Sequence, residues 1–357
     1  MIRHSTCLLL LIAFSWGRAA SAQEDAWQTK TALGWEAFQQ GRYADAEQLF
    51  SEAMTEAQQV EGAERRLALA TSYLADLYRK QGRYRESASL SARALVLAGR
   101  KERGDLLRAG LLHKLGQLAA EQGQSARAEA LLQHSLRETE QAVGPQHQQV
   151  ALMRSNLGQF YSAQRKFGRA RDTLERAVAT WQALRLPANP EFATMLSNLG
   201  AVYYEQRQYA RAEALYRRAL AIEEASPGAD ASVARDLNNL ATVYLDTQRL
   251  PEAESLYRRS LALSERTAGS ELLLAQTLHN FAELRRKEER FEEAEVLYRR
   301  AAAVWEKALG PDHPEFIRKL ELLATAYRAM ARYIEAGNLQ TRAAEIRVRN
   351  GFRARPK

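Results

Sequence analysis

The feature that most constrains this chain is an internal repeat of 41 to 42 residues. Eight positions, which we call markers, hold an aromatic or bulky residue in seven cases and serine in the eighth. A small residue lies nine positions before each marker, and two more lie three and ten positions after it. Eight such registers indicate an array of similar units rather than separate globular domains. The markers are Tyr43, Tyr84, Ser125, Phe167, Tyr209, Leu250, Phe291 and Tyr333.

Each repeat is expected to form two antiparallel helices, helix A before the marker and helix B after it. Apolar residues at positions −10, −6, +3, +6, +7 and +10 from the marker recur at helical spacing, which gives each helix one buried face. The small residues allow the two helices to cross closely, because a larger side chain would overpack the contact. Pro251 suits the first turn of a helix B. The remaining prolines of the array are expected in loops between repeats, at Pro145, Pro187, Pro190, Pro227, Pro311 and Pro314.

This pattern resembles the tetratricopeptide repeat family, most clearly in Ser197-Asn-Leu-Gly-Ala-Val-Tyr-Tyr-Glu-Gln-Arg-Gln-Tyr-Ala-Arg-Ala-Glu-Ala-Leu-Tyr-Arg-Arg-Ala-Leu220. The usual period of that family is about 34 residues. The longer period, with segments such as Asn238-Asn-Leu-Ala241 and Leu309-Gly-Pro-Asp-His-Pro314, looks like its long-repeat, kinesin-light-chain-like branch. The resemblance implies an all-α, right-handed superhelical solenoid of eight helix-turn-helix repeats over residues 23–349. It also implies that the A helices line a concave groove and the B helices form the outer wall.

The first 22 residues have the pattern of a cleaved secretory signal peptide. A short basic start with Arg3 precedes an apolar run of about ten residues from Cys7 to Trp16, and Ala20-Ser21-Ala22 supplies the small residues of a cleavage site. The run is too short to span a bilayer, which takes about twenty residues, although an uncleaved anchor is the alternative. Cys7 is the only cysteine, so cleavage leaves a chain without thiol chemistry. We therefore expect a periplasmic or secreted protein that begins at Gln23.

The charge of the chain is basic but modest. Removing Arg3 and Arg18 with the signal peptide lowers the formal net charge from +8 to +6. Residues 350–357 form a short basic C-terminal tail. A basic chain often binds nucleic acid, but an exported protein seldom meets it, so nucleic acid is not expected as a partner.

The search for chemistry along the sequence favours a protein that is not an enzyme. The histidines do not pair at metal-ligand spacing, and no phosphate-binding glycine loop or nucleophile elbow occurs. His113 and His279 share position −12 of their helices A, where a contact with a partner is favoured over catalysis. We therefore expect no catalytic residues, no metal and no cofactor.

Pairs of arginines recur on helix B of three repeats, at Arg217-Arg218, Arg258-Arg259 and Arg299-Arg300. They could form a basic stripe for an anionic surface. However, Glu213, Glu254 and Glu295 each lie four residues before the first arginine, an arrangement that forms favourable helix-surface pairs of about 0.2–0.5 kcal/mol. The sequence therefore favours a solvated, charge-paired face.

Asparagines recur at position −11 in four successive repeats, although asparagine is a mediocre helix former. One interpretation is structural, with the amides bonding between adjacent A helices. The other is recognition, because an amide can both donate to and accept from an extended peptide backbone; asparagines in this motif of the related branch are associated with peptide binding. In the recognition reading, Arg286 and Lys287 attract an acidic residue of the ligand. The candidate peptide-binding residues are Asn156, Asn198, Asn238, Asn239, His279, Asn280, Arg286 and Lys287.

Two functions stay open on the sequence alone. The favoured one is an exported, non-catalytic scaffold that binds a peptide or partner protein in its concave groove. The alternative is an envelope- or membrane-peripheral protein that uses its basic surface on anionic polymer or lipid without spanning the membrane. Salt separates them, because screening weakens charge-driven binding. The sequence identifies neither the partner nor the oligomeric state.

Overall fold

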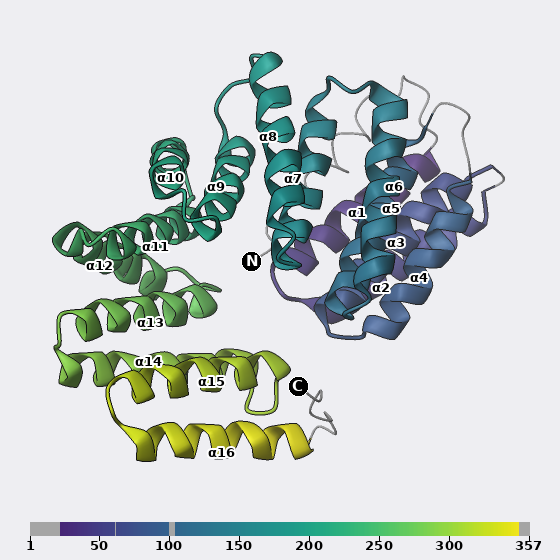
Figure 1. Ribbon diagram of the computed structural model, residues 1–357. Helices are drawn as coiled ribbons and strands as arrows, with labels where there is room; N and C mark the ends of the chain where they lie inside the picture. The colour runs from purple at the N-terminus through teal and green to yellow at the C-terminus, as the bar shows by residue number, and fades with distance from the viewer. Residues whose placement is uncertain (1–21, 61, 100–103, 350–357) are drawn as a thin grey trace. The chain divides into compact units, whose positions relative to one another are not determined.

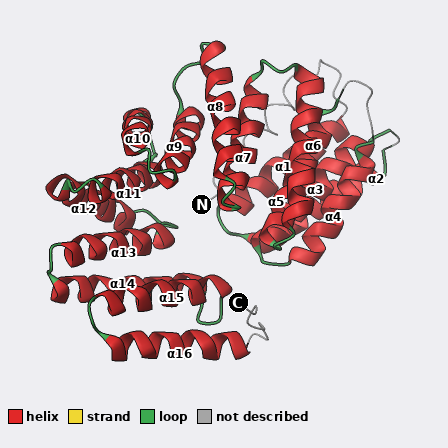
Figure 2. Cartoon of the chain, in the orientation of Figure 1, coloured by secondary structure: helices red, strands yellow, loops and turns green. Residues whose placement is uncertain are grey.

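The computed structural model describes residues 22–60, 62–99 and 104–349, and this part of the chain is built of helices joined by short loops (Figures 1 and 2). The sixteen helices of the described residues are α1 (Ala22–Gln39), α2 (Tyr43–Gln58), α3 (Glu64–Lys80), α4 (Tyr84–Leu97), α5 (Leu106–Glu121), α6 (Ser125–Val143), α7 (Gln148–Ala163), α8 (Phe167–Ala183), α9 (Pro190–Glu205), α10 (Tyr209–Glu224), α11 (Asp230–Asp246), α12 (Leu250–Arg266), α13 (Glu271–Lys287), α14 (Phe291–Leu309), α15 (Pro314–Ala329) and α16 (Tyr333–Arg349).

The chain divides into two compact units, Met1–Leu186 with α1 to α8 and Pro187–Lys357 with α9 to α16. Within each unit, four helical hairpins follow one another, and each helix packs against the helices before and after it. Each unit is therefore a solenoid of four repeats, which confirms the expected all-α repeat fold. The right-handed superhelix stays a prediction.

Each of the eight markers is the first residue of a helix B, that is, of an even-numbered helix. The residue two positions before the marker has a positive φ in all eight repeats; it is glycine in the first three repeats and another residue in the last five. The next residue then donates its backbone N–H back to helix A, as from Arg249 to the carbonyl of Tyr244 at 2.8 Å. This left-handed turn closes the end of helix A and reverses the chain. The five non-glycine residues are Arg165, Arg207, Gln248, Glu289 and Ala331.

The small residues lie where helices A and B cross, as expected. A Cβ added at Gly158 of α7 would be 2.5 Å from Cγ of Leu174 in α8, and Gly200 of α9 approaches Tyr216 in the same way. The alanines at positions +3 and +10 are almost fully buried. Where serine replaces alanine, its hydroxyl donates to a carbonyl of helix A, as from Ser260 to Ala234 at 2.7 Å. Each hairpin is thus held by close backbone approach.

The prolines lie between repeats with one difference from the expectation. Pro190 and Pro314 are the first residues of α9 and α15, rather than loop residues. The first helical position tolerates proline because its backbone N–H has no partner inside the helix. Pro251 lies in the first turn of α12, as predicted.

The ends of the chain are outside the described residues. The signal peptide over residues 1–22 and the basic tail over residues 350–357 therefore stay predictions. Among the described helices, none combines the length and the apolar character needed to cross a membrane.

Candidate functional site

The asparagine register lies on the A helices, and in several repeats its side chains connect neighbouring A helices. In the second unit, Nδ2 of Asn280 on α13 donates to Oδ1 of Asn238 on α11 at 3.0 Å and to Oγ1 of Thr242 at 3.3 Å. In the first unit, Nδ2 of Asn156 on α7 lies 3.3 Å from Nε2 of His113 on α5. In both cases, position −11 of one repeat bonds to position −12 of the repeat before it. These two asparagines therefore have the structural role.

A lysine makes the same connection earlier in the first unit. Nζ of Lys114, at position −11 of the third repeat, lies 2.6 Å from Oδ2 of Asp76 and 3.4 Å from Oγ of Ser72. Ser72 occupies position −12 and Asp76 position −8 of the preceding repeat, as Asn238 and Thr242 do in the second unit. The register thus fastens adjacent A helices with whichever polar side chains are present.

Asn198 on α9 and Asn239 on α11 differ from Asn156 and Asn280. Both side chains are partly exposed, and within the described residues their amides make no hydrogen bond. For Asn239, the corresponding partners on α9 are Ser197, which donates its hydroxyl hydrogen to Ala193 and Asp236, and Ala201, which has no polar side chain. The two amides are consequently available to a ligand.

The two candidate residues at position −12 are not part of the accessible floor that the sequence predicted. Asn238 and His279 are each 5% exposed. His279 packs against Tyr298 and Trp305 of α14, with ring centroids 5.4 and 5.7 Å apart. Position −12 faces the helix–helix interface because α14 packs directly over this face of α13. A binding role for these two residues would require the repeat to open.

Both buried histidines are neutral at ordinary pH. Burial lowers the pKa of His113 to about 4 and that of His279 to about 4. A neutral ring can accept through Nε2, which fits the bond from Asn156 to His113. These rings act as packing and hydrogen-bonding groups inside the repeats.

The two basic candidates already have acidic partners. Arg286 binds Glu283 one turn earlier on α13 at 2.8 Å, and Lys287 reaches back to α11, 3.2 Å from the carbonyl of Leu245 and 3.4 Å from Oδ1 of Asp246. The carboxylate of Glu283 also accepts the Tyr298 hydroxyl. These pairings do not favour the predicted attraction of an acidic ligand, because the charges are largely compensated inside the protein.

Sequence reasoning missed a polar bridge across three A helices of the second unit. The hydroxyl of Tyr204 on α9 donates to Oδ2 of Asp246 on α11 at 2.6 Å, and the same carboxylate attracts Lys287 of α13. Burial and Asp246 raise the pKa of Tyr204. The separation of 41 or 42 residues between these positions was the available signal, because equivalent positions of successive repeats lie side by side.

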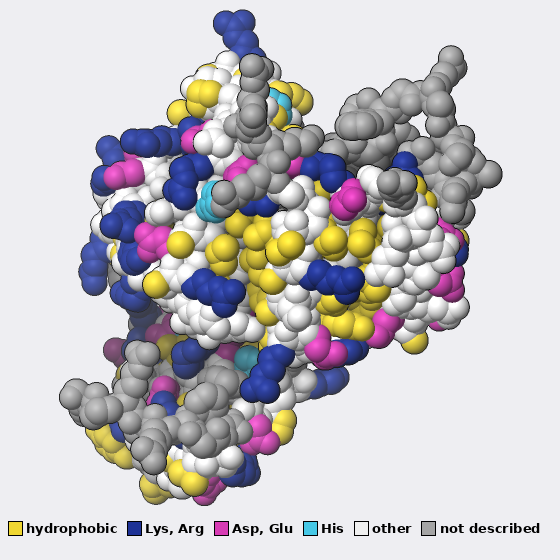
Figure 3. Space-filling model, turned by 90° about the vertical axis from the view of Figure 1, so that its right-hand side faces the viewer, with side chains coloured by type: hydrophobic (Ala, Val, Ile, Leu, Met, Phe, Trp, Pro, Cys, Tyr) yellow, Lys and Arg dark blue, Asp and Glu magenta, His cyan; other side chains and the backbone are white. Residues whose placement is uncertain are grey.

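The arginine pairs on the B helices are paired as expected. Arg217 binds Glu213 at 2.9 Å, Arg258 binds Glu254 at 2.7 Å, and Arg299 binds Glu295. Two of the second arginines reach the preceding helix B instead, in the contacts Arg259–Glu224 and Arg300–Glu265, and Arg342 and Glu306 repeat this contact in the last repeat. Arg218 instead lies over the ring of Phe192, 5.0 Å from its centroid. On the face in Figure 3, basic side chains are scattered with acidic ones among them. The charge-paired interpretation is confirmed for five of these six arginines.

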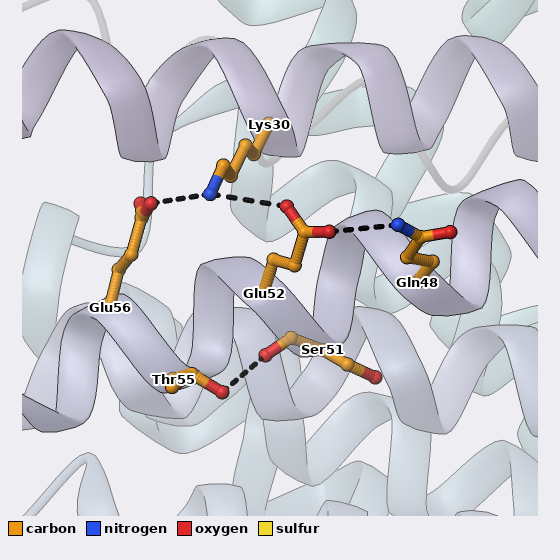
Figure 4. A pocket seen from close by; sticks show the side chains of 6 residues that line it. All are labelled: Lys30, Gln48, Ser51, Glu52, Thr55 and Glu56. Atoms are coloured by element: carbon orange, nitrogen blue, oxygen red, sulfur yellow. Dashed lines mark hydrogen bonds and ion pairs between the residues drawn. The ribbon is translucent and has the colours of Figure 1, made fainter.

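A hollow of about 320 Å³ lies between α1 and α2 (Figure 4). Its charged residues bind one another: Nζ of Lys30 lies 2.5 Å from Oε1 of Glu56 and 3.1 Å from Oε2 of Glu52. Gln48 donates to Glu52, and the Thr55 hydroxyl donates to the carbonyl of Ser51. The single lysine of the hollow is thus shared by two glutamates of α2. Among the described residues, no group of three or more potential metal ligands occurs.

Comparisons with known proteins identify the repeats. The family model described as tetratricopeptide repeat matches residues 107–183, 191–266 and 273–348, more than half of the chain, and two further models of that description match residues 28–65 and 70–105. No curated protein matches this chain.

Solved structures of similar fold cover most of the chain. BtubC (BKLC) from P. vanneervenii is 25% identical, over 70% of this chain and 94% of that one, with a TM-score of 0.54. Aspartyl phosphate phosphatase F from Bacillus subtilis is 14% identical, over 96% and 99% of the two chains, with a TM-score of 0.63. A Rap protein complexed with competence and sporulation factor is 13% identical, over 92% and 99%, with a TM-score of 0.59. The last two likenesses show the fold alone.

Proposed function

The chain belongs to the tetratricopeptide repeat family, and on that premise we propose that it is a non-catalytic scaffold that binds an extended peptide, or an extended segment of a partner protein. The contact surface lies on the A helices of the second unit, α9, α11 and α13. Proteins of this family generally serve as interaction scaffolds, which supports the proposal. The potential site is a row of polar side chains without a catalytic group among them.

The observation that carries this proposal is the contrast within the asparagine register. The side-chain amides of Asn156 and Asn280 form hydrogen bonds with the neighbouring A helix. Within the described residues, the side-chain amides of Asn198 and Asn239 form none. Each free amide can donate one hydrogen bond and accept another, which is what one peptide unit of an extended chain needs. Packed helices lie about 8–10 Å apart, and an extended chain advances about 3.3 Å per residue. The two amides therefore match backbone groups about three residues apart.

A polar bridge further along the same A helices, six or seven residues after the asparagine register, holds these helices together. Tyr204, Asp246 and Lys287 connect α9, α11 and α13 in sequence. A rigid surface loses little conformational entropy when a ligand binds. Because the basic residues nearby are paired, recognition through amides should persist from about 0.05 to 0.3 M salt, where surface charges are strongly screened.

The test begins with a peptide selected by the mature chain from a random displayed library and then synthesised as the probe. Asn198→Ala with Asn239→Ala should weaken its binding by about 1–3 kcal/mol, roughly 5- to 150-fold. The fold should persist because alanine is the better helix former. Asn280→Ala is the matched control: it removes an amide in the same register that the protein itself uses, so it should lower the melting temperature and leave the affinity per folded molecule unchanged. Unchanged affinity in the double variant would exclude this site.

We further propose that the protein is exported and cleaved after Ala22, which is supported by the residue pattern at the N-terminus. Mass spectrometry of the protein purified from its natural source should find Gln23, cyclised or not, as the first residue. An intact Met1 in a cytosolic fraction would refute export. The alternative function on anionic polymer or lipid loses support, because five of the six arginines that suggested it are paired with glutamates.

A further inference from the structure

Two carboxyl groups meet inside the second unit, between the fifth and sixth repeats. Glu223 near the end of α10 and Asp236 on α11 both have fully buried side chains, at 0% exposure. Oε2 of Glu223 is buried and receives no hydrogen bond from the described residues. A buried carboxylate oxygen without a donor is costly, so the ionised form of Glu223 is poorly accommodated.

The other repeat interfaces show that this pair is unusual. Glu223 occupies position +14 of its repeat and Asp236 position −14 of the next. The equivalent pairs within each unit contain no acidic residue. They are Ala57 with Ala70, Ala98 with Leu111, Thr139 with Met153, Ser264 with Thr277, and Trp305 with Lys319. Packing of the solenoid therefore does not require acids here.

The groups that face the pair do not balance two negative charges. Among the described residues, Arg235 of α11 is the one cation that contacts the pair, with Nη2 3.1 Å from Oε1 of Glu223 and Nε 3.5 Å from Oδ1 of Asp236. From α9, Ser197 donates its hydroxyl to Oδ2 of Asp236 at 2.5 Å. From α10, Tyr216 adds an uncharged hydroxyl: burial, and then the charges of Asp236 and of Glu205 on α9, raise its pKa.

The neighbouring helix α12 adds no compensating charge. Its Arg259 binds the exposed Glu224 rather than Glu223. With both acids ionised, the buried cluster would carry one uncompensated negative charge, and a proton held by the pair removes it.

We propose that Glu223 and Asp236 hold one proton between them and act as a pH-dependent lock between the fifth and sixth repeats. The protonated carboxyl supplies the donor that the pair lacks and leaves one carboxylate for Arg235. Loss of the proton leaves two carboxylates in contact and loosens α10 from α11. The lock does not depend on the proposed function, although α9 and α11 also carry Asn198 and Asn239.

The sign of the pH effect follows from proton binding. Burial, followed by the charge of Asp236, raises the pKa of Glu223 to about 8, and burial raises the pKa of Asp236. The unfolded chain loses the proton of a glutamate near its ordinary pKa of about 4.3. The folded protein therefore binds more protons than the unfolded chain above that pH, and its stability falls as pH rises until the folded form is deprotonated.

The buried histidines determine which pH range is suitable for the test. The pKa values of His113 and His279 are lowered to about 4, so these groups make stability rise with pH up to the ordinary histidine pKa of about 6.5. Above that pH their contribution is constant. A comparison between pH 7 and pH 9 therefore removes most of the histidine contribution, and the difference between the wild type and a variant of the pair separates the carboxyl pair from the tyrosines, whose raised pKa values also favour lower stability at high pH.

The experiment measures thermal unfolding of the full mature chain at pH 7 and pH 9 by circular dichroism. Across this window, a group with a folded pKa near 8 raises the unfolding equilibrium constant about tenfold, a fall of about 2–4 °C in melting temperature. Glu223→Gln keeps the shape and the donor but cannot ionise, so it should remove that fall. Glu224→Gln, the exposed neighbour, is the control and should retain it.

A second variant provides the same test if Glu223→Gln does not fold. Glu223→Ser with Asp236→Thr transplants the Ser264 and Thr277 pair of the next interface and should also remove the fall. Parallel pH responses of the wild type and either folded variant would overturn the proposal. So would a wild-type melting temperature that stays level or rises between pH 7 and pH 9.

Discussion

The close approach of helices A and B can be tested by adding a single methyl group to it. Gly158 of α7 lies against Leu174 of α8, and an alanine Cβ at that position would be 2.5 Å from Cγ and 2.9 Å from Cδ2 of the leucine. Leu174 is fully buried, so it has no open space into which to move. Carbon atoms pack best about 3.5–4.0 Å apart. Gly158→Ala therefore requires a shift of about 1 Å at the crossing.

Two opposing effects set the magnitude. Alanine is favoured over glycine inside a helix by about 1 kcal/mol, whereas overpacking a well-packed contact costs about 1–3 kcal/mol. Gly110 of α5 provides the matched control, because an added Cβ there meets no atom within 4 Å. Gly110→Ala should thus stabilise the same unit by about 1 kcal/mol. The free energy of unfolding of Gly158→Ala should be lower than that of Gly110→Ala by about 1–3 kcal/mol.

The assay is thermal unfolding of the two variants side by side, followed by circular dichroism. A deficit of that size corresponds to a melting temperature roughly 2–12 °C lower for Gly158→Ala than for Gly110→Ala. Far-ultraviolet spectra at low temperature should remain equal, because both variants keep the helices. If Gly158→Ala were as stable as Gly110→Ala, the close approach would not limit residue size, and the argument from small residues would fail.

Further predictions concern the other repeated positions. Ala212→Leu and Ala253→Leu, at fully buried crossings, should each lower stability by about 1–3 kcal/mol, whereas Ala214→Leu on the exposed face of α10 should have little effect; equal melting temperatures for all three would mean that the register is wrong. Gln248→Gly should raise stability by up to about 1 kcal/mol, because Gln248 has a φ of 62° and left-handed backbone is unfavourable for residues with a Cβ. In the opposite direction, Gly82→Ala, at a φ of 77°, should lower the melting temperature, and a rise would contradict the turn geometry.

Much of the fold could be predicted from the sequence because the relevant signals are local. The marker residues predicted where each helix B begins, and the structure places the first residue of α2, α4 and every later even-numbered helix there. The glutamates four residues before Arg217, Arg258 and Arg299 predicted ion pairs that are present. Interactions within one helix are readable because its geometry fixes which residues share a face.

The candidate site was predicted less well. The asparagine register was identified, but whether each amide binds the protein or stays free depends on the neighbouring repeat. Asn280 finds Asn238 and Thr242 opposite it, whereas Asn239 faces an alanine and a serine bonded elsewhere. His279 was expected to line the groove, and α14 covers it. The periodicity of apolar residues along one helix does not indicate which residues of other helices pack against it.

The sequence by itself determined the repeat length, the division of each repeat into two helices and the small residues at their crossings. These follow from helical periodicity and side-chain volume within about forty residues of chain. Only the tertiary structure decided which polar groups are satisfied, which are free, and that Glu223 and Asp236 meet with a single arginine between them. The physical reason is that burial and hydrogen bonding are properties of the interface between repeats. Residues far apart in the chain meet there, and a charge that would be solvated on one helix loses its water against the next.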